Sequence, residues 1–375
     1  MSSTVMMVAG EASGDLHGAS LLRALRRHEP DLHAFGIGGK HLAAAGMEIL
    51  VSSDDVATMG FTETFGSLAR VLRAYRVASQ ALRERRPDLL VLIDYPEFNL
   101  RLAARAKRLG LRVFYYISPQ VWAWRRGRIR RMRQIVDRLA VVFPFEEALY
   151  NHNAHRLAYF VGHPLLDLVH PTREAQETRA LYGLRTDQRL LAILPGSRKK
   201  EIRLLLPPAL ATARLLAANG WQSALALAPT LRPEDVYAVA SEQDLAEVPI
   251  VQGDTYNLVH SADAALVASG TATLEVALLG KPMVIVYRVS PLTFALGRML
   301  VRVNHIGMPN LVLGQRVAPE FLQGSVRPAQ LAPAIEQAWA ERERFAEAWR
   351  QVREKLGQPG AAERAAALAW ELIRS

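Results

Sequence analysis

The chain has 375 residues, of which 50% are hydrophobic and 22% are charged. At about 100–200 residues per domain, this length predicts two globular domains, and the composition gives each of them enough apolar residues for a core. The sequence has no cysteine, which excludes disulfides, a thiolate nucleophile and zinc–sulfur sites. We expect no secretory signal, because the apolar start is short and lacks a basic segment, and no spanning helix, which needs roughly 18 uncharged apolar residues.

The net charge of +10 is unevenly distributed along the chain. Between Arg101 and Arg138 there are twelve Arg or Lys residues and a single acid, Asp137. Basic proteins attract nucleic acids, anionic lipid surfaces or phosphorylated substrates. The charge therefore predicts an anionic partner without choosing among these three.

In the first half of the chain, short apolar runs alternate with amphipathic stretches, as in βαβ units. The runs are continuous rather than alternating in polarity, which is typical of parallel strands buried on both faces. The predicted strands are Val5–Ala9, Ala34–Ile37, Glu48–Val51, Leu89–Asp94, Val113–Ile117, Leu139–Phe143 and Ala158–Val161. The predicted helices between them include Leu16–Arg27, Leu68–Arg83 and Leu100–Leu109.

The second half repeats this organisation after a polar stretch, residues 171–188, that predicts a helix and a linker. Its predicted strands are Leu190–Leu194, Ser223–Ala228, Pro249–Val251, Ala264–Ala268 and Met283–Tyr287, and its helices include Ile202–Ala218 and Thr273–Leu279. The tail, residues 328–375, is helical with a break at Gly357–Gly360.

The sequence therefore predicts an α/β fold with two parallel-sheet domains, residues 1–170 and 171–340. The C-terminal helices, residues 341–375, are expected to pack back on the first domain of this chain or of a partner subunit. Because ligands bind such sheets beyond the C-terminal ends of the strands, we expect the site in a cleft between the two domains.

Two loops of the first half carry candidate functional groups. Residues 9–15, Ala-Gly-Glu-Ala-Ser-Gly-Asp, lead from a strand into a helix. Glycines there let a ligand approach the backbone, and the start of a helix favours anions. The alternative is a tight turn without a ligand. The loop lacks both G-x-G-x-x-G and the P-loop lysine, so NAD and ATP binding lose their main support. Asp94 ends the strand of Leu-Ile-Asp-Tyr-Pro-Glu-Phe-Asn, where it can accept a proton from a hydroxyl or simply cap the next helix.

A third segment, residues 118–126, places Trp122 and Trp124 beside an arginine run. Such a segment can grip a sugar, a lipid or a base, and aromatic residues interleaved with arginine also occur in nucleic-acid-binding proteins. The alternative is a solvated basic helix.

Two loops of the second half predict an anion site. Leu-Pro-Gly-Ser-Arg, residues 194–198, joins a Gly-Ser turn to Arg198 and can clamp a phosphate, although a surface turn is the alternative. In residues 268–275, small and hydroxyl side chains begin a helix that carries Glu275. Glu275 can accept hydrogen bonds from ribose hydroxyls. The alternative is that it only stabilises the first turn of the helix. The chain has no Asp-x-Asp, and His152 and His155 lack a nearby carboxylate, so we expect no metal.

The runs AGEASGD, LIDYPEFN, SPQVWAWR, LPGSR, SGTATLE and MPNLVLG, in this order and spacing, resemble the lipid-A-disaccharide synthase family from about Val5 to about Gln323. The resemblance implies a GT-B fold, with two Rossmann-like domains facing each other across a cleft: a first domain that binds the acceptor and contacts the membrane, and a second that binds the UDP-sugar. It also implies the transfer of a sugar from UDP-2,3-diacylglucosamine to 2,3-diacylglucosamine 1-phosphate, which gives the β-1,6-linked lipid A disaccharide 1-phosphate and UDP, without a metal or other cofactor. The family works at the cytoplasmic face of the inner membrane, as a monomer or homodimer, and binds no nucleic acid.

The resemblance assigns catalytic roles to Asp94, Arg198 and Asn310, the last within Met-Pro-Asn-Leu where the family pattern has Leu-Pro-Asn-Leu. It matches Glu11 and Ser13 to an acceptor-side loop and Glu275 to the ribose-binding acid of related UDP-sugar transferases. Together with the loops described above, the predicted substrate-binding residues are Glu11, Ser13, Gly14, Trp122, Gly196, Ser197, Ser269, Gly270, Thr271, Thr273 and Glu275.

Because both substrates carry acyl chains, the protein must meet a bilayer. Phe61, Phe65, Leu68, Leu72 and Tyr75 fall at spacings of three and four, on one face of a helix flanked by arginines. A core-facing helix has the same pattern and remains the alternative. Leu204, close to Arg198, is a second candidate membrane contact.

Two rival functions remain. Another GT-B enzyme, such as a UDP-GlcNAc 2-epimerase or the peptidoglycan transferase, shares the Glu275 region but not AGEASGD together with LIDYPEFN. A non-catalytic nucleic-acid-binding protein would use the Trp–Arg segment, would show salt-sensitive RNA or DNA binding and would release no UDP.

Overall fold

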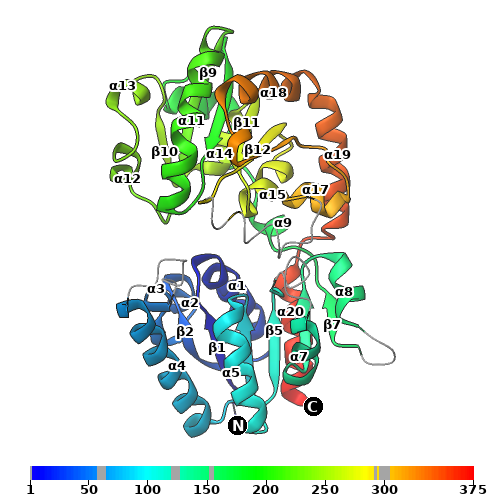
Figure 1. Ribbon diagram of the computed structural model, residues 1–375. Helices are drawn as coiled ribbons and strands as arrows, with labels where there is room; N and C mark the ends of the chain where they lie inside the picture. The colour runs from blue at the N-terminus through cyan, green and yellow to red at the C-terminus, as the bar shows by residue number, and fades with distance from the viewer. Residues whose placement is uncertain (1, 57–64, 120–126, 152–155, 291–293, 295–304) are drawn as a thin grey trace. The chain divides into compact units, whose positions relative to one another are not determined.

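The computed structural model describes all residues except 1, 57–64, 120–126, 152–155, 291–293 and 295–304. The chain divides into two compact units (Figure 1). The first unit comprises Met1–Pro164 and Gly357–Ser375, and the second comprises Leu165–Leu356. The α/β organisation in two parallel-sheet units is confirmed, and the boundary expected near residue 170 lies at residue 164.

The first unit is built on a seven-stranded parallel sheet with the order β3-β2-β1-β4-β5-β6-β7. Its strands are β1 (Thr4–Ala9), β2 (His33–Gly38), β3 (Glu48–Ser52), β4 (Leu89–Ile93), β5 (Val113–Tyr116), β6 (Arg138–Val141) and β7 (Ala158–Phe160). The central strands β1, β4 and β5 are buried almost throughout, which explains their continuous apolar sequences.

Helices cover both faces of this sheet. They are α1 (Ala12–His28), α2 (Lys40–Ala44), α3 (Ser53–Val56), α4 (Phe65–Arg85), α5 (Pro96–Arg108), α7 (Gly127–Ile135), α8 (Pro144–Tyr150) and α20 (Ala361–Arg374). Helices α1 and α20 pack against each other and against the central strands, whereas α5 packs on β4 and β5 beside α4 and α7. A large apolar core lies between the sheet and α4, α5 and α7.

The second unit has a six-stranded parallel sheet with the order β10-β9-β8-β11-β12-β13. Its strands are β8 (Arg189–Leu194), β9 (Trp221–Leu227), β10 (Ile250–Gln252), β11 (Ala264–Ala268), β12 (Met283–Tyr287) and β13 (Glu320–Leu322). The sequence predicted the first five of these strands but not β13, which has three residues, begins with a charged one and pairs with β12.

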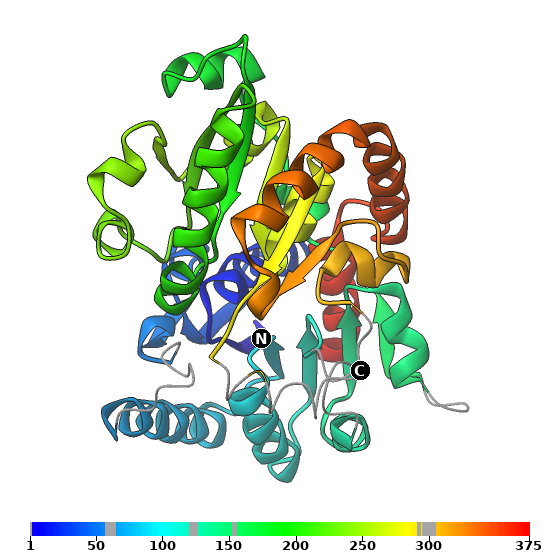
Figure 2. The same cartoon turned by 45° about the horizontal axis from the view of Figure 1, so that its top comes forward.

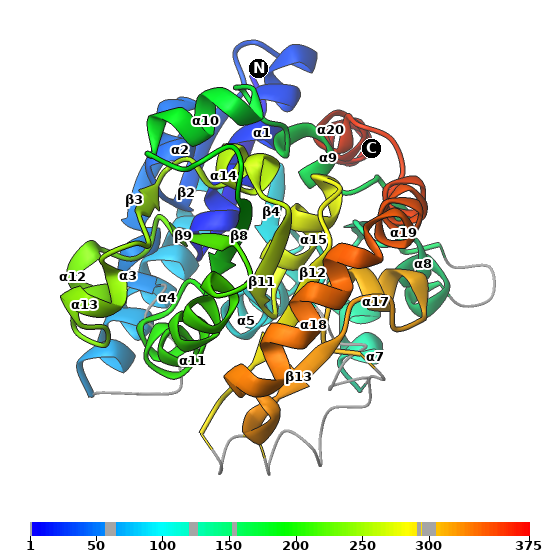
Figure 3. The ribbon, with the colours of Figure 1, turned by 90° about the horizontal axis from the view of Figure 1, so that it is seen from above.

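Helices again cover both faces of this second sheet. They are α9 (Leu165–Leu168), α10 (Ala175–Leu181), α11 (Lys199–Ala217), α12 (Pro233–Tyr237), α13 (Glu242–Leu245), α14 (Thr255–Ser261), α15 (Thr271–Leu278), α17 (Met308–Leu313), α18 (Pro328–Ala340) and α19 (Arg342–Lys355), with a short 3-10 helix at Gln323–Ser325. Helices α11 and α18 lie together on one face (Figure 2). Helices α14 and α15 lie on the opposite face (Figure 3).

The two C-terminal helices belong to different units, which corrects the expectation that residues 341–375 pack as one segment on the first domain. Helix α19 lies in the second unit, where Phe345, Trp349 and Val352 are buried and Trp349 Nε1 donates to the Lys281 carbonyl at 2.8 Å. Only α20 joins the first unit, beyond the predicted break at Gly357–Gly360. There Arg27 pairs with Glu363 on α20.

Each sheet reverses its strand order at one point, and the predicted motifs fall there. In the first sheet the reversal lies between β1 and β4, which lead into the loop of residues 9–15 and into Asp94. In the second it lies between β8 and β11, which lead into residues 194–198 and 268–275. Since ligands of open α/β sheets bind beyond the carboxyl ends of strands at such reversals, the topology gives each unit one candidate site edge.

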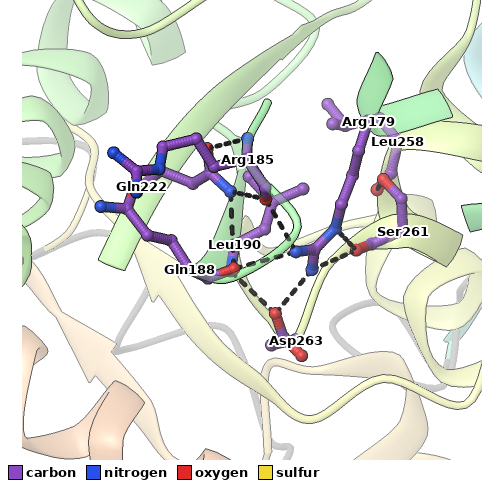
Figure 4. A network of polar contacts seen from close by, with 8 residues as sticks. All are labelled: Arg179, Arg185, Gln188, Leu190, Gln222, Leu258, Ser261 and Asp263. Carbon is purple, nitrogen blue, oxygen red and sulfur yellow. Dashed lines mark hydrogen bonds and ion pairs between the residues drawn. The ribbon is translucent and has the colours of Figure 1, made fainter. Parts of the chain in front are cut away.

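A buried arginine ties the opposite end of the second sheet together (Figure 4). The Arg179 guanidinium on α10 donates to the carbonyl of Ser261 and to those of Arg185 and Gln188, and it pairs with the Asp263 carboxylate at 2.8 Å. The same carboxylate accepts from the backbone N–H of Leu190 on β8. This network joins α10, the loop before β8, and the end of α14 with the start of β11.

We expect Arg179→Leu to destabilise the second unit by about 3 kcal/mol, because three carbonyls and one carboxylate each lose a donor that a guanidinium only 11% exposed now supplies. Arg185→Leu is the matched control: its pair with Asp187 is about two-thirds exposed on both sides, and loss of such an exposed pair changes stability little. Guanidinium unfolding of the two variants measures the difference, and equal losses would show that the buried network contributes no more than a surface pair.

Candidate functional site

The end of β4 turns sharply, and this turn presents Asp94. Asp94 and Tyr95 both adopt left-handed backbone conformations, with φ of 45° and 47°. Pro96 then opens α5, where a missing N–H costs nothing. Asp94 is therefore not the N-cap of α5, which was the alternative interpretation of the sequence; Tyr95 occupies that position.

The Asp94 carboxyl has the most strongly perturbed carboxylate pKa of the first unit's site edge. Burial, and second the negative charge of Glu11, raise the pKa of Asp94 to about 7, while a hydrogen bond from the Tyr95 backbone N–H opposes the rise. Glu11 is half-buried and directly precedes α1. The structure thus brings together the two acidic residues that the sequence placed in separate motifs. A carboxyl with such a pKa can take up and release a proton near neutral pH.

The two motifs also interlock sterically. Gly10 lies so close to the Tyr95 ring that a Cβ at residue 10 would sit 2.6 Å from Tyr95 Cγ. The Tyr95 hydroxyl donates to the Val56 carbonyl at 2.8 Å, which fixes the ring. Ser13 is exposed in the first turn of α1, and Gly14 is buried there.

Two histidines that sequence reasoning missed lie at this edge of the first unit. His17 is on α1, and His163 follows β7 with its ring 5.2 Å from that of Phe143. Burial lowers the pKa of His17 to about 4 and, with the charge of His17, that of His163 to about 3. Both imidazoles are therefore neutral at pH 7. No short motif marks them, because their pairing depends on the fold.

The segment with Trp122 lies outside the described residues, but its two ends are anchored. Before it, the Ser118 hydroxyl donates to the buried Glu146 carboxylate at 2.6 Å. After it, Arg128 at the start of α7 pairs with Glu97 on α5. The segment therefore begins and ends next to β5 and α5, two elements that also surround Asp94.

In the second unit, the loop after β8 is closed by a carboxylate that the sequence did not flag. Glu201 Oε2 accepts from the backbone N–H groups of Ser197 at 2.9 Å and Arg198 at 3.3 Å. Gly196, with φ of 114°, makes room for it, because a Cβ there would lie 2.7 Å from Glu201 Cβ. These backbone N–H groups are thus used internally, and the Arg198 guanidinium, 73% exposed, forms a 3.6 Å ion pair with the same glutamate while remaining accessible from solvent.

The loop after β11 also differs in detail from expectation. The Ser269 hydroxyl donates to the Ile306 carbonyl at 2.8 Å, and the buried Thr273 hydroxyl donates to the Gly270 carbonyl at 2.7 Å. Both hydroxyl hydrogens are therefore engaged within the protein in this structure. Gly270 and Thr271 are exposed at the start of α15, where the first N–H groups of a helix lack intrahelical partners.

Glu275 lies on α15 in the position expected for a hydroxyl acceptor. It is half-buried, and the Tyr256 hydroxyl donates to Oε1 at 3.1 Å. Burial raises the pKa of Glu275, and the tyrosine hydrogen bond opposes this. Its second oxygen remains able to accept hydrogen bonds from a ligand.

Asn310 holds a loop rather than facing a ligand, which revises its expected catalytic role. It is fully buried; its Nδ2 donates to the Ala318 carbonyl and to Glu320, and its Oδ1 accepts from the N–H groups of Val317 and Ala318. Glu320 in turn accepts from the N–H groups of Ile306 and Gly307. Asn310 is therefore a positioning residue for the loop that receives the Ser269 hydroxyl.

The predicted membrane contacts have mixed outcomes. Phe61 and the side chains of Phe65 and Leu68 lie outside the described residues, whereas Leu72 on α4 is 43% exposed. The core-facing side of α4 includes Val71, Ala74, Ala78 and Leu82, and Tyr75 of the predicted stripe also packs against this core. Leu204 on α11 is half-buried, and the two leucines after it are in the core. No helix in the described part of the chain is long and apolar enough to cross a membrane.

Comparison with known sequences gives one family over almost the whole chain. A family model described as lipid-A-disaccharide synthetase matches residues 5–369. A lipid-A-disaccharide synthase of Syntrophus aciditrophicus is 47% identical over 100% of this chain and 98% of its own length. One of Geobacter metallireducens is 44% identical over 98% of this chain and 97% of its own.

Comparison with solved structures gives the fold. The calicheamicin glycosyltransferase CalG4 superposes with a TM-score of 0.63 at 16% identity, covering 100% of this chain and 98% of its own. A UDP-GlcNAc 2-epimerase from Neisseria meningitidis, solved with UDP-GlcNAc, gives 0.62 at 11% identity, covering 99% and 100%. These likenesses confirm the GT-B fold and, at such low identities, nothing further.

The contact between Gly10 and Tyr95 predicts a sharp difference between two glycines of one motif. We expect Gly10→Ala to displace the Tyr95 ring and cost about 1–3 kcal/mol through overpacking. Gly14→Ala is the control, because its Cβ would meet Ala9 at an ordinary 3.6 Å within a helix, where alanine is favoured by about 0.5–1 kcal/mol. Thermal unfolding measures both, and a Gly10→Ala protein as stable as the parent would contradict the interlock.

Proposed function

Because the chain belongs to the lipid-A-disaccharide synthetase family, we propose that it joins UDP-2,3-diacylglucosamine to 2,3-diacylglucosamine 1-phosphate and releases UDP. The activity of the family, glycosyl transfer in lipid A synthesis, does not support the alternative that the chain is a non-catalytic nucleic-acid-binding protein. The epimerase and peptidoglycan-type alternatives share only the fold with this chain.

One observation carries the proposed mechanism: Asp94 stands at the strand reversal of the first sheet with a pKa of about 7. In this mechanism its carboxylate takes the proton of the acceptor 6-hydroxyl. The oxygen forms a bond to the anomeric carbon of the donor as the bond from that carbon to the diphosphate oxygen breaks, and the electron pair leaves with UDP. Attack from the face opposite UDP inverts the anomeric configuration.

The second unit supplies the charges that suit the leaving diphosphate. Arg198 presents an exposed guanidinium after β8, and α15 begins with exposed residues after β11. Preorganised donors of this kind stabilise charge that develops as the bond breaks. In the described part of the chain no group of three or more His, Asp or Glu side chains is arranged to hold a metal ion, so the proposal assigns this role to protein groups.

Glu275 is proposed to bind the ribose of UDP. Its half-buried carboxyl is fixed by Tyr256 and retains acceptor capacity. A carboxylate that accepts from two neighbouring hydroxyls distinguishes a ribose from sugars with another hydroxyl arrangement. The proposal places the nucleotide beside α15 and leaves Arg198 for the diphosphate.

We further propose that α4 and α5 contact the cytoplasmic face of the inner membrane. A groove between these helices is lined by apolar side chains, including Leu72 and Phe98, and is edged by Arg101, Arg108 and Arg131. The combination of the exposed Leu72 side chain with arginines suits an interface with anionic lipid. Three arginines of the basic stretch between residues 101 and 138 line this groove, together with one acid, Glu97.

Asp94→Asn is expected to lower kcat by about 10²–10⁴-fold, because general-base catalysis is lost while UDP binding in the second unit is retained. In the parent protein, kcat/KM should fall as the pH drops below about 7, since protonated Asp94 cannot act as a base. UDP release and calorimetric UDP binding measure these effects. Asp31→Asn, at an exposed site, is the control. Near-normal turnover of the Asp94 variant would remove Asp94 from the mechanism.

Leu72→Ser together with Arg101→Ser is expected to weaken binding to vesicles that contain anionic phospholipid, because both the apolar contact and a cation of the groove are lost. Leu181→Ser in the second unit, where the side chain is 60% exposed, is the matched control for a surface leucine. Vesicle sedimentation at low and moderate salt measures binding, with thermal unfolding to establish that each variant is folded. Unchanged sedimentation of the double variant would place the membrane contact elsewhere.

A further inference from the structure

The peptide that joins Asp94 to Tyr95 is held in a costly conformation. Both residues lie in the left-handed region, which costs residues other than glycine on the order of 1–3 kcal/mol each. Such strain persists only where the surrounding structure holds it in place. The groups that hold this peptide therefore determine the geometry of the proposed base.

Two buried side chains hold the carbonyl side of this peptide. Asn99 Nδ2 on α5 donates to the Asp94 carbonyl oxygen at 2.7 Å, and the Tyr115 hydroxyl on β5 donates to the same oxygen. Both residues are fully buried. Asn99 Nδ2 also reaches the Ile93 carbonyl at 3.2 Å, so one amide group ties α5 to the end of β4.

The other side of the same peptide holds the carboxylate. The Tyr95 N–H of this peptide lowers the pKa of the Asp94 carboxyl and thereby favours its charged form. Because a peptide is planar, fixing the direction of its carbonyl oxygen also fixes the direction of its N–H. A rotation of this peptide would remove the N–H from the carboxylate and let the side chain take other rotamers.

We propose that Asn99 and Tyr115 are positioning residues that orient the Asp94 carboxylate for proton transfer by holding the Asp94–Tyr95 peptide plane. This inference rests on the proposed role of Asp94 as the base. Neither residue would touch the reacting atoms. Their contribution is to keep the carboxylate in the one orientation in which its free oxygen meets the acceptor hydroxyl.

The charged groups around Asp94 set the pKa that the pH profile of the enzyme would report. Glu11, from the loop before α1, raises the pKa of Asp94. On β5, burial first and then the charge of Asp94 raise the pKa of Tyr115, whereas Arg128 on α7 lowers it. The Tyr115 pKa lies well above its ordinary value, so this hydroxyl remains a donor throughout the neutral range. Removal of the Tyr115 hydroxyl therefore deletes its hydrogen bond to the Asp94 carbonyl and leaves the charge of the site unchanged.

The test uses Tyr115→Phe, which deletes one hydroxyl, and Asn99→Leu, which replaces the amide by an apolar group of similar size. For each we expect kcat to fall about 10- to 100-fold, as for other misplacements of a catalytic group, with KM of both substrates within about twofold. The acidic limb of the pH profile should move to higher pH, because a carboxylate that loses a donor holds its proton more tightly. Carboxyl carbon NMR of Asp94 should show the same upward movement.

Tyr182→Phe is the control for the loss of a hydrogen-bonded tyrosine hydroxyl, because the Tyr182 hydroxyl donates to Asp254 at 2.8 Å in the second unit. It should lower stability and leave the pH profile in place. If Asn99→Leu does not fold, Tyr115→Phe decides the matter alone.

The possible failures are separable. An inactive Asp94→Asn variant combined with unchanged kcat and an unmoved acidic limb in Tyr115→Phe would overturn the positioning role and leave the base intact. An active Asp94→Asn variant would show that Asp94 is not the base, and the hydrogen bonds from Asn99 and Tyr115 would then have no catalytic role. This conclusion would hold even if the NMR titration of Asp94 still moved in Tyr115→Phe.

Discussion

The first unit's site depends on a single backbone turn, the left-handed pair at Asp94 and Tyr95. This turn lets the chain leave a fully buried strand and enter α5 within two residues, with the ring of Tyr95 directed towards Gly10. The two hydrogen bonds to the Asp94 carbonyl offset part of the strain. The requirement for glycine at residue 10 follows from the same turn, because no side chain fits beneath the ring. Two motifs separated by some eighty residues thus form one steric unit.

The sequence predicted the strands well, for reasons that are clear in the structure. Strands such as β4, Leu89–Ile93, are buried on both faces, so their sequences are continuously apolar and bounded by polar residues. The same rule failed for β13, Glu320–Leu322, because its glutamate is buried through hydrogen bonds to Ile306, Gly307 and Asn310 rather than through apolarity. A polar residue that is satisfied by distant partners cannot be recognised from its neighbours in sequence.

Site residues were predictable as positions but less so as roles. Asp94, Glu11, Arg198 and Glu275 lie at the strand reversals, where their motifs placed them. Glu201 was not recognised, because the capping-box signature requires Ser, Thr, Asp or Asn three residues before the acid, and Arg198 occupies that position. Asn310 and Thr273 carry family motifs, yet they use their hydrogen-bonding groups to hold the loops around Ser269. A motif indicates which positions have a function. Only the hydrogen-bond partners of a residue show whether it can contact a ligand or whether it holds a ligand-binding residue in place.

The charges at the two candidate site edges differ in a way that suits glycosyl transfer. The first unit's edge carries Asp94 and Glu11, and burial keeps His17 and His163 neutral, so neither imidazole brings a positive charge that would lower the pKa of Asp94. The second unit's edge carries Arg198 and the start of α15, which favour negative charge. Deprotonation of a hydroxyl and departure of a diphosphate need these opposite environments. Because the acidic edge and the basic edge belong to different units, burial can raise the pKa of Asp94 without weakening the anion site at Arg198. The groups that set the properties of each edge lie within its own unit.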